Sequence, residues 1–320
     1  MNITVIGCGR WGSLITWYLD RTGHRVTLYG RPESARMQRF LETRSNDLLT
    51  LPQSVALSTD LSCVQEAETV IISIGSQSLR GLMEELRPMT LRGKTFVLCM
   101  KGLEIGTGRR LSEIAKDNLD ASNHVAVWLG PGHVQEFYRG VPNCMVIDSD
   151  DQQVKQRLVQ EFSSDLIRFY YGNDLLGNEV GAAAKNVVGI AAGFLDGVEM
   201  SSLKGALMSR GTREVARLIR AMGGNELSAY GLCHLGDYEA TVFSPYSHNR
   251  QFGESFIRHQ DYHRLAEGYY TVEALMVLSE RYQVELPICR AVHAILYENA
   301  DPREQLTELL RRGLRAEFDD

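Results

Sequence analysis

The segment Gly7-Cys8-Gly9-Arg10-Trp11-Gly12 constrains the fold of this chain more than any other part of the sequence. It follows the pattern G-x-G-x-x-G between an apolar strand predicted at Asn2–Ile6 and a helix predicted at Trp11–Arg21, and a second strand is predicted at His24–Tyr29. In such a unit the first glycine permits a tight turn, the second lets the backbone approach a pyrophosphate, and the third allows the helix to pack closely on the strand. The free N–H groups at the start of the helix then bind the phosphates. The context predicts a dinucleotide site and disfavours the alternative of a glycine-rich turn without a ligand.

Strand and helix patterns alternate through the first half of the chain. Further strands are predicted at Thr69–Ile74, Thr95–Met100, Val125–Leu129 and Cys144–Ile147, with helices at Leu79–Leu86 and Gly108–Asn118 between them. Such alternation is typical of a parallel, doubly wound α/β sheet of the Rossmann type.

The second half of the chain lacks strand-like alternation. Helices are predicted at Asn178–Leu195, Gly205–Met222, Tyr270–Tyr282, Ile288–Glu298 and Asp301–Arg312. We therefore predict two domains, a dinucleotide-binding domain at 1–177 and an all-α substrate and catalytic domain at 178–320.

The overall composition excludes several classes of protein. The net charge of -6 argues against a nucleic-acid-binding protein, and no apolar run reaches the roughly 18 residues of a membrane span. The six cysteines are scattered without a C-x-x-C pair, which favours a reducing compartment and disfavours disulfides or structural zinc. We expect a cytoplasmic protein without a metal site, and a homodimer as the commonest oligomer.

The end of the second strand bears on the choice of cofactor. A carboxylate there would favour NAD, but the sequence has Tyr29-Gly30-Arg31. Arg31 is suited to pair with a 2′-phosphate, so NADP is favoured over NAD; a solvated arginine is the alternative.

The helix predicted from Asn178 is unusually rich in small residues. Gly181, Gly189 and Gly193 recur at spacings of four or eight residues, which predicts close approach by other elements. Each glycine costs the helix roughly 1 kcal/mol relative to alanine, so such a helix requires packing on several sides. Burial of Lys185 in its middle would lower the lysine pKa toward the range useful for proton transfer. A lysine that reaches the surface is the alternative.

These segments, taken together and in this order, resemble the bacterial NAD(P)-dependent glycerol-3-phosphate dehydrogenase family over nearly the whole chain. The phosphate loop with its tryptophan and the Ala184-Lys185-Asn186-Val187 helix both match. The other matching segments are Lys101-Gly102-Leu103-Glu104, Gly130-Pro131, Gly236-Asp237 with Thr241, Ser247 with Asn249, Arg250 and Gly253, Glu267-Gly268, and Glu285-Leu286-Pro287-Ile288.

The resemblance implies a role for each matching residue. Lys185 would be the catalytic acid and base, with Lys101 and Asp237 as its catalytic partners. The substrate site would consist of Lys101, Gly130, Gly132, Asn186, Asp237, Thr241, Ser247, His248 and Asn249. The cofactor site would consist of Gly7, Gly9, Arg10, Trp11, Gly12, Arg31, Lys101, Val134, His248 and Glu267.

The implied activity is that of an oxidoreductase acting on a small phosphorylated three-carbon substrate. Hydride would pass from the nicotinamide to C2 of dihydroxyacetone phosphate and give sn-glycerol 3-phosphate, a precursor of glycerophospholipids. Lys185 would supply the proton, and Lys101 would stabilise the charge that develops on the oxygen.

The sequence departs from the family pattern at the substrate end. His248 stands where the family has an arginine that would grip the phosphate, and Gly132-His133 replaces Ser or Thr followed by Phe. Arg250 or Lys204 is a candidate to compensate, and His133 and His248 are candidates to form a pair that responds to pH. The alternatives are a reductase of a related phosphorylated or phosphonylated hydroxyketone or keto acid, and a sensor that binds NAD(P) without turnover.

Overall fold

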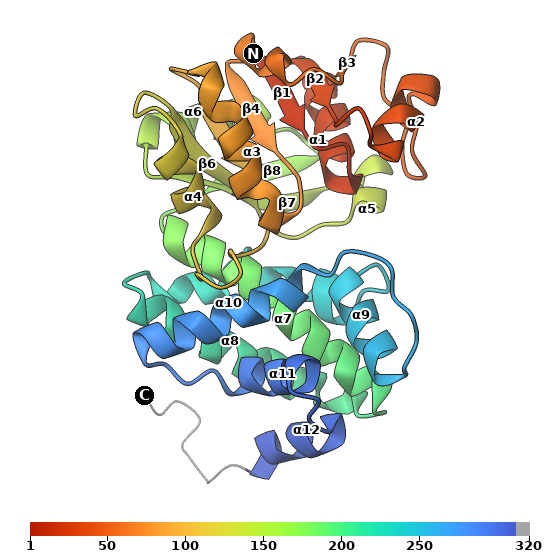
Figure 1. Ribbon diagram of the computed structural model, residues 1–320, viewed down its shortest axis with the longest axis vertical. Coiled ribbons are helices and arrows are strands. Elements are labelled where there is room, and N and C mark those ends of the chain that lie inside the picture. Colours follow the sequence, from red (N-terminus) through yellow and green to blue (C-terminus); the bar gives the residue numbers. More distant parts are fainter. Residues whose placement is uncertain (312–320) are drawn as a thin grey trace.

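The computed structural model describes residues 1–311, and Figure 1 shows two regions, a sheet covered by helices and a helical bundle below it. The sheet has eight strands in the order β3-β2-β1-β4-β5-β6-β7-β8. The strands are β1 (Asn2–Ile6), β2 (Arg25–Tyr29), β3 (Ala56–Ser58), β4 (Thr69–Ile72), β5 (Thr95–Leu98), β6 (His124–Leu129), β7 (Asn143–Ser149) and β8 (Ile167–Tyr171). The prediction of a Rossmann-type sheet is therefore confirmed, although β3 and β8 were missed.

One strand pair corrects the expectation of an all-parallel sheet. Strands β6 and β7 pair antiparallel, with Leu129 opposite Val146. Their connection holds only α5 (Val134–Tyr138), a five-residue helix, which spans roughly 7 to 8 Å. Parallel crossovers usually carry a longer helix that runs back along the strands. The chain therefore turns back, and β7 runs in the opposite direction.

Helices cover both faces of the sheet and bury its apolar strands. On one face lie α1 (Arg10–Arg21), α5 and α6 (Gln152–Phe162), and on the other α3 (Leu79–Leu86) and α4 (Leu111–Asn118). The remaining helix of this region, α2 (Ala35–Thr43), buries Met37 and Phe40. The parallel register places the ends of β1, β2, β4 and β5 at a single edge, which faces the helical region.

The helical region is built around α7 (Leu175–Gly197), which is buried along almost its whole length. The surrounding helices are α8 (Lys204–Ala221), α9 (His248–Ile257), α10 (Glu267–Tyr282), α11 (Pro287–Tyr297) and α12 (Pro302–Arg311). Residue 312 of the predicted last helix lies outside the described residues. The predicted domain boundary at 177 falls in the first turn of α7, where Leu175 packs against the core of the sheet.

The predicted close approach to the glycines of α7 is confirmed. A Cβ on Gly193 would lie 2.1 Å from the Arg250 carbonyl oxygen, and one on Gly189 would lie 2.7 Å from Thr241 Cγ2. From the other side, a Cβ on Gly253 of α9 would lie 2.3 Å from the Ile190 carbonyl oxygen. The two helices therefore touch through their backbones, which brings the start of α9 close to Lys185.

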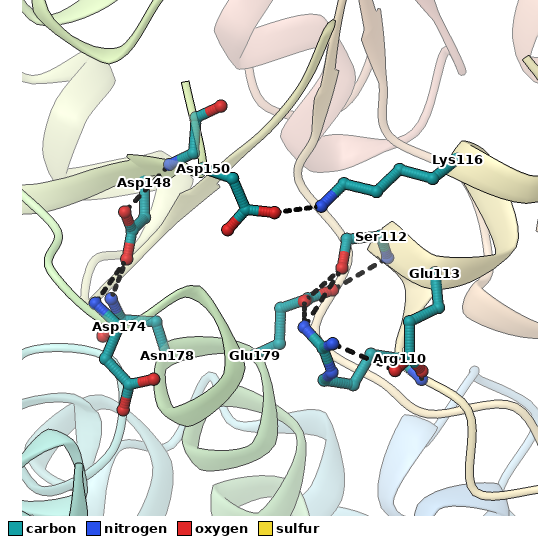
Figure 2. A network of polar contacts seen from close by, with 10 residues as sticks. Arg110, Ser112, Glu113, Lys116, Asp148, Asp150, Asp174, Asn178 and Glu179 are labelled. Atoms are coloured by element: carbon teal, nitrogen blue, oxygen red, sulfur yellow. Dashed lines mark hydrogen bonds and ion pairs between the residues drawn. The ribbon is translucent and has the colours of Figure 1, made fainter. Parts of the chain in front are cut away.

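A buried polar network ties α7 to the sheet region (Figure 2). The Glu179 carboxylate of α7 accepts hydrogen bonds from Arg110 Nη1 and the Ser112 N–H, both at 2.9 Å, and from Ser112 Oγ at 2.5 Å. Nearby, Asn178 Nδ2 donates to Asp148 Oδ2 at 2.8 Å. Helix α7 is therefore fixed to the sheet by directional bonds as well as by apolar packing.

Within residues 1–311, no helix combines the length and the apolar character needed to cross a membrane.

Candidate active site

The glycine loop after β1 has the backbone shape that its sequence predicts. Gly7 has a φ of 114°, and a Cβ there would lie 2.1 Å from the Ser73 carbonyl oxygen. A Cβ on Gly12 would lie 1.9 Å from the Gly7 carbonyl oxygen, so both positions require glycine. At Gly9 the nearest atom is Arg36 Nη1 at 3.9 Å, which leaves open space beside the backbone at the start of α1. A pyrophosphate fits such a cradle.

Two lysines and one carboxylate form the centre of the site. Lys185 Nζ, on α7, lies 2.7 Å from Asp237 Oδ2, and Lys101 Nζ, beyond the end of β5, lies 2.7 Å from the same oxygen. Lys185 also donates to Thr241 Oγ1 at 2.9 Å, and Lys101 to the Gly130 carbonyl at 2.6 Å. The structure thus brings together four segments that are far apart in the sequence, at residues 101, 130, 185 and 237–241.

The environment of Lys185 favours release of its proton. Its side chain is 9% exposed, and burial lowers the pKa of Lys185 to about 8, against the opposing effect of Asp237. Lys101 adds to the lowering by repulsion between like charges. An ammonium group with such a pKa is suited to donate a proton near neutral pH.

A chain of amide hydrogen bonds holds the surrounding backbone in place. Asn186 Nδ2 donates to the Lys101 carbonyl at 2.7 Å, Asn249 Nδ2 donates to Asn186 Oδ1 at 3.0 Å, and the Gly268 N–H donates to Asn249 Oδ1 at 2.9 Å. These three hydrogen bonds connect the segment after β5 to α7, α9 and α10. Both asparagines therefore position the site as well as bordering it.

The central residues border a cavity of about 210 Å³. It is lined by Arg10, Lys101, Gly132, His133, Lys185, Asn186, Asp237, Ala240, Thr241, Tyr246, Ser247, His248 and Asn249. A three-carbon phosphate is small enough for such a volume. Ser247 is also the N-cap of α9, because its Oγ accepts from the Arg250 N–H at 3.3 Å.

The two histidines of the cavity have different partners, so the predicted His133–His248 pair is wrong. His248 Nε2 lies 2.8 Å from Arg10 Nη1. The His133 ring packs against Tyr246, with ring centroids 5.4 Å apart, and its buried Nε2 has no partner within residues 1–311. Burial lowers the pKa of His133.

The predicted compensation for the arginine missing at position 248 is also wrong. Arg250 Nη1 lies 2.6 Å from Asp196 Oδ2, and Lys204 Nζ lies 2.7 Å from the same oxygen. Neither side chain lines the cavity. Their charges are satisfied by Asp196 instead.

Several of the predicted cofactor residues have defined partners in the structure. Arg31 Nη2 forms a half-exposed ion pair with Glu85 Oε1 at 2.6 Å, so an acidic group is present that the sequence pattern did not reveal. Glu267, at the start of α10, accepts from the Ser76 N–H at 2.9 Å and from the Ser76 hydroxyl, and burial raises the pKa of Glu267. Trp11 packs against Phe137 of α5, the helix that begins at Val134.

Sequence reasoning missed several residues of the site. Arg36 lies beside Gly9, Tyr246 lines the cavity, and Ser76 binds Glu267. None belongs to a recognisable motif. Only Ser34 gives a signal in the sequence, because an N-cap residue there predicts a helix directly after β2. Arg36 would then lie in the first turn of that helix, close to the glycine loop.

The sequence matches two family models that together cover most of the chain. Residues 2–155 match "NAD-dependent glycerol-3-phosphate dehydrogenase N-terminus", and residues 174–307 match "NAD-dependent glycerol-3-phosphate dehydrogenase C-terminus". The chain belongs to this family.

Relatives and solved structures agree with this family membership. The glycerol-3-phosphate dehydrogenase [NAD(P)+] of Prosthecochloris aestuarii is 33% identical, with 99% of this chain and all of the relative covered. A relative of the same name from Salinibacter ruber is 34% identical over 99% of this chain and 97% of its own length. The crystal structure of the Coxiella burnetii glycerol-3-phosphate dehydrogenase has a TM-score of 0.91 at 27% identity, covering 97% and 99% of the two chains.

The fold alone is shared more widely. A ketopantoate reductase family structure from Ralstonia eutropha has a TM-score of 0.62 at 16% identity, covering 96% of this chain and all of that chain. Such a likeness reflects the common plan of a Rossmann sheet and a helical region. The choice between substrates therefore depends on the cavity.

Proposed function

We propose that this protein reduces dihydroxyacetone phosphate to sn-glycerol 3-phosphate, reversibly, with NADPH or NADH, and so supplies glycerophospholipid synthesis. The observation that supports this most is the Lys185–Asp237–Lys101 arrangement, placed in a small cavity at the edge of the sheet where the glycine loop lies. Membership of the family supports the same activity.

The residues of the chain account for the proton half of the reaction. Bound NAD(P)H supplies a hydride, which adds two electrons and a hydrogen to the C2 carbonyl carbon. Lys185 donates its Nζ proton to the carbonyl oxygen, which completes the alcohol, and takes a proton back in the reverse direction. Lys101, the second ammonium group on Asp237, stabilises the negative charge on that oxygen during transfer. Asp237 holds both groups in place.

The same proposal assigns the other residues of the cavity. Thr241 and Asn186 orient Lys185 and the backbone of Lys101, and Ser247, His248 and Asn249 border the region available to the phosphate. Gly130 and Gly132 contribute backbone groups, and both have the positive φ values that glycine tolerates. Gly7, Gly9, Arg10, Trp11, Gly12, Val134 and Glu267 form the cofactor side.

NADPH is proposed as the preferred cofactor. Arg31 follows β2, and Arg36 lies beside Gly9, so two guanidinium groups are near the expected adenosine ribose. A 2′-phosphate would compete with Glu85 for Arg31. The scattered free cysteines favour a reducing compartment such as the cytoplasm, where we propose a homodimer.

A spectrophotometric assay with both cofactors tests the proposal. We expect oxidation of NADPH, and more slowly of NADH, with dihydroxyacetone phosphate, and much lower kcat/KM with unphosphorylated dihydroxyacetone or ketopantoate. Preference for ketopantoate would instead identify a keto acid reductase. Tight NADPH binding without turnover of any ketone would identify a sensor.

A further inference from the structure

The charges around the cavity are unequal at its two ends. Lys185 and Lys101 share the Asp237 carboxylate, and His133 lines the same cavity. At the substrate end, His248 Nε2 lies 2.8 Å from Arg10 Nη1, and the charges of Arg36 and Arg264 also act on the His248 ring. Among the described residues, these three arginines form no ion pair with a carboxylate. One end of the cavity is therefore set for proton transfer, and the other carries positive charge that is not neutralised.

Arg10 is the one of these arginines that lines the cavity. It is half-buried, and its only side-chain partner within residues 1–311 is His248, at 2.8 Å. A guanidinium group removed from water without an anion is costly, and it pairs well with phosphate through parallel hydrogen bonds. The position of Arg10 therefore favours an anionic group of the ligand.

His248 acts as the hydrogen-bond acceptor in this contact. A guanidinium group only donates hydrogen bonds, so His248 Nε2 must be the unprotonated nitrogen that accepts from Arg10. Burial, together with the charges of Arg10, Arg264 and Arg36, lowers the pKa of His248 and so favours the neutral ring that this contact requires. His248 therefore contributes no charge of its own, and it directs the guanidinium group.

Two basic residues of the helical region are already engaged. Arg250 and Lys204 bind Asp196, away from the cavity. Arg10 begins α1 in the sheet region, whereas His248 begins α9 in the helical region. The guanidinium group of Arg10 thus reaches from the glycine loop into the cavity and lies beside His248. Position 248 on α9 is the one at which the family pattern has an arginine.

We propose that Arg10, positioned by His248, binds the phosphate group of the substrate in this protein. The inference rests on the proposed function, because it identifies the phosphate-bearing end of the same cavity. It assigns to the glycine loop a role in substrate recognition in addition to cofactor binding.

Steady-state kinetics of Arg10→Ala tests the inference. At saturating NADPH, we expect KM for dihydroxyacetone phosphate to rise by about 10-fold to 100-fold, as for the loss of a charge-assisted contact. Because Arg10 also borders the cofactor side, Kd for NADPH is measured separately for each variant. At saturating NADPH, kcat/KM should fall much more for dihydroxyacetone phosphate than for unphosphorylated dihydroxyacetone, which lacks the group that Arg10 would bind. Arg39→Ala removes an exposed arginine of α2 that pairs with Asp47, so it serves as the charge-matched control. An equal KM in Arg10→Ala and wild type, or a loss confined to NADPH binding, would overturn the inference.

Two further variants separate recognition from folding. Arg10→Lys should recover part of the affinity, and the double variant Arg10→Ala/His248→Arg should recover more, because it returns a guanidinium group from the opposite side of the contact. If the double variant binds no better than Arg10→Ala, a guanidinium group at position 248 does not reach the site that Arg10 occupies, and this would count against the inference.

A binding measurement distinguishes this inference from the proposed function. Calorimetric titration of sn-glycerol 3-phosphate into the NADP⁺-bound protein reports recognition of the phosphate without turnover. Wild type that fails to reduce dihydroxyacetone phosphate would contradict the proposed function alone, provided that the titration still shows binding that Arg10→Ala weakens. Equal binding by both proteins, or no binding by either, would overturn the inference about Arg10.

Discussion

Asp237 lies between two ammonium groups, and one oxygen of its carboxylate contacts both. Attraction to Asp237 raises the pKa of Lys185 and partly offsets the lowering by burial, which leaves it at about 8. The carboxylate therefore keeps a buried lysine protonated at neutral pH. Without the carboxylate, burial and repulsion by Lys101 would both lower the pKa of Lys185 with no opposing charge.

The pH dependence of turnover follows from this balance. Reduction needs protonated Lys185, so kcat for reduction should be level below pH 7 and fall as the pH rises through about 8. Oxidation of glycerol 3-phosphate needs the neutral amine and should rise over the same range. Parallel profiles measured in the two directions would contradict the assignment.

Replacement of Asp237 tests the electrostatic part of the account. In Asp237→Asn we expect the midpoint for reduction to move down by about one pH unit or more, because the group that raises the pKa is gone. Asp117→Asn, an exposed carboxylate paired with Arg109, is the matched control and should leave the midpoint in place. An unshifted midpoint in Asp237→Asn would show that another group titrates.

At this scale the sequence predicted the central residues and missed the contact at the substrate end. Lys101, Lys185 and Asp237 lie within motifs whose order identifies a family. The contact between Arg10 and His248 joins residues separated by 238 positions. No local pattern encodes such a pair, so Arg250 and Lys204, which are nearer in the chain or of similar charge, were the wrong candidates.

At the scale of elements, α7 owes its position to its glycines. The backbones of α7 and α9 touch at Gly193 and Gly253, and Gly189 makes room for Thr241, the hydroxyl that binds Lys185. The cost of glycine in a helix is thus offset by close packing. The distance between Lys185 and its partners depends on this contact.

A glycine series tests this packing. Gly193→Ala places a methyl group 2.1 Å from the Arg250 carbonyl oxygen, so we expect a loss of about 1–3 kcal/mol in the free energy of unfolding, and reduced kcat. Gly205→Ala in α8 has no atom within 4 Å of its Cβ and should be neutral or stabilise by up to about 1 kcal/mol. Denaturant titration of the two variants measures the difference. A Gly193→Ala protein as stable as Gly205→Ala would refute the close contact.

Periodicity predicted most elements, but it did not predict the direction of β7. Apolar patterns mark where strands lie, and they carry no information about pairing direction. The short β3 and the half-exposed β8 were missed for a different reason, since the former has three residues and the latter lies at the sheet edge.

At the scale of the whole molecule, α7 joins the two regions. Its first residues pack against the sheet, and the Glu179 carboxylate binds Arg110 and Ser112 across the boundary (Figure 2). The sequence-based boundary at 177 treats this helix as part of the second domain alone. Because the helix belongs to both cores, we expect a single cooperative unfolding transition.

Removal of Glu179 tests the connection. Glu179→Ala leaves Arg110 and the donors of Ser112 without their buried acceptor, so we expect a loss of about 3–5 kcal/mol in the free energy of unfolding. Asp150→Asn breaks the exposed ion pair with Lys116 in the same region and should cost at most about 1 kcal/mol. Thermal unfolding of both variants measures the contrast, and similar melting temperatures would show that the network contributes little.

The most direct test of the central claim is replacement of the buried lysine of α7. In Lys185→Ala we expect turnover of dihydroxyacetone phosphate to fall by about 10²-fold to 10⁴-fold, as for the loss of a general acid. Kd for NADPH, measured by fluorescence titration, should stay within about 3-fold of wild type, a difference of less than 1 kcal/mol. Turnover at the wild-type rate in this variant would contradict the assignment of Lys185 as the proton donor.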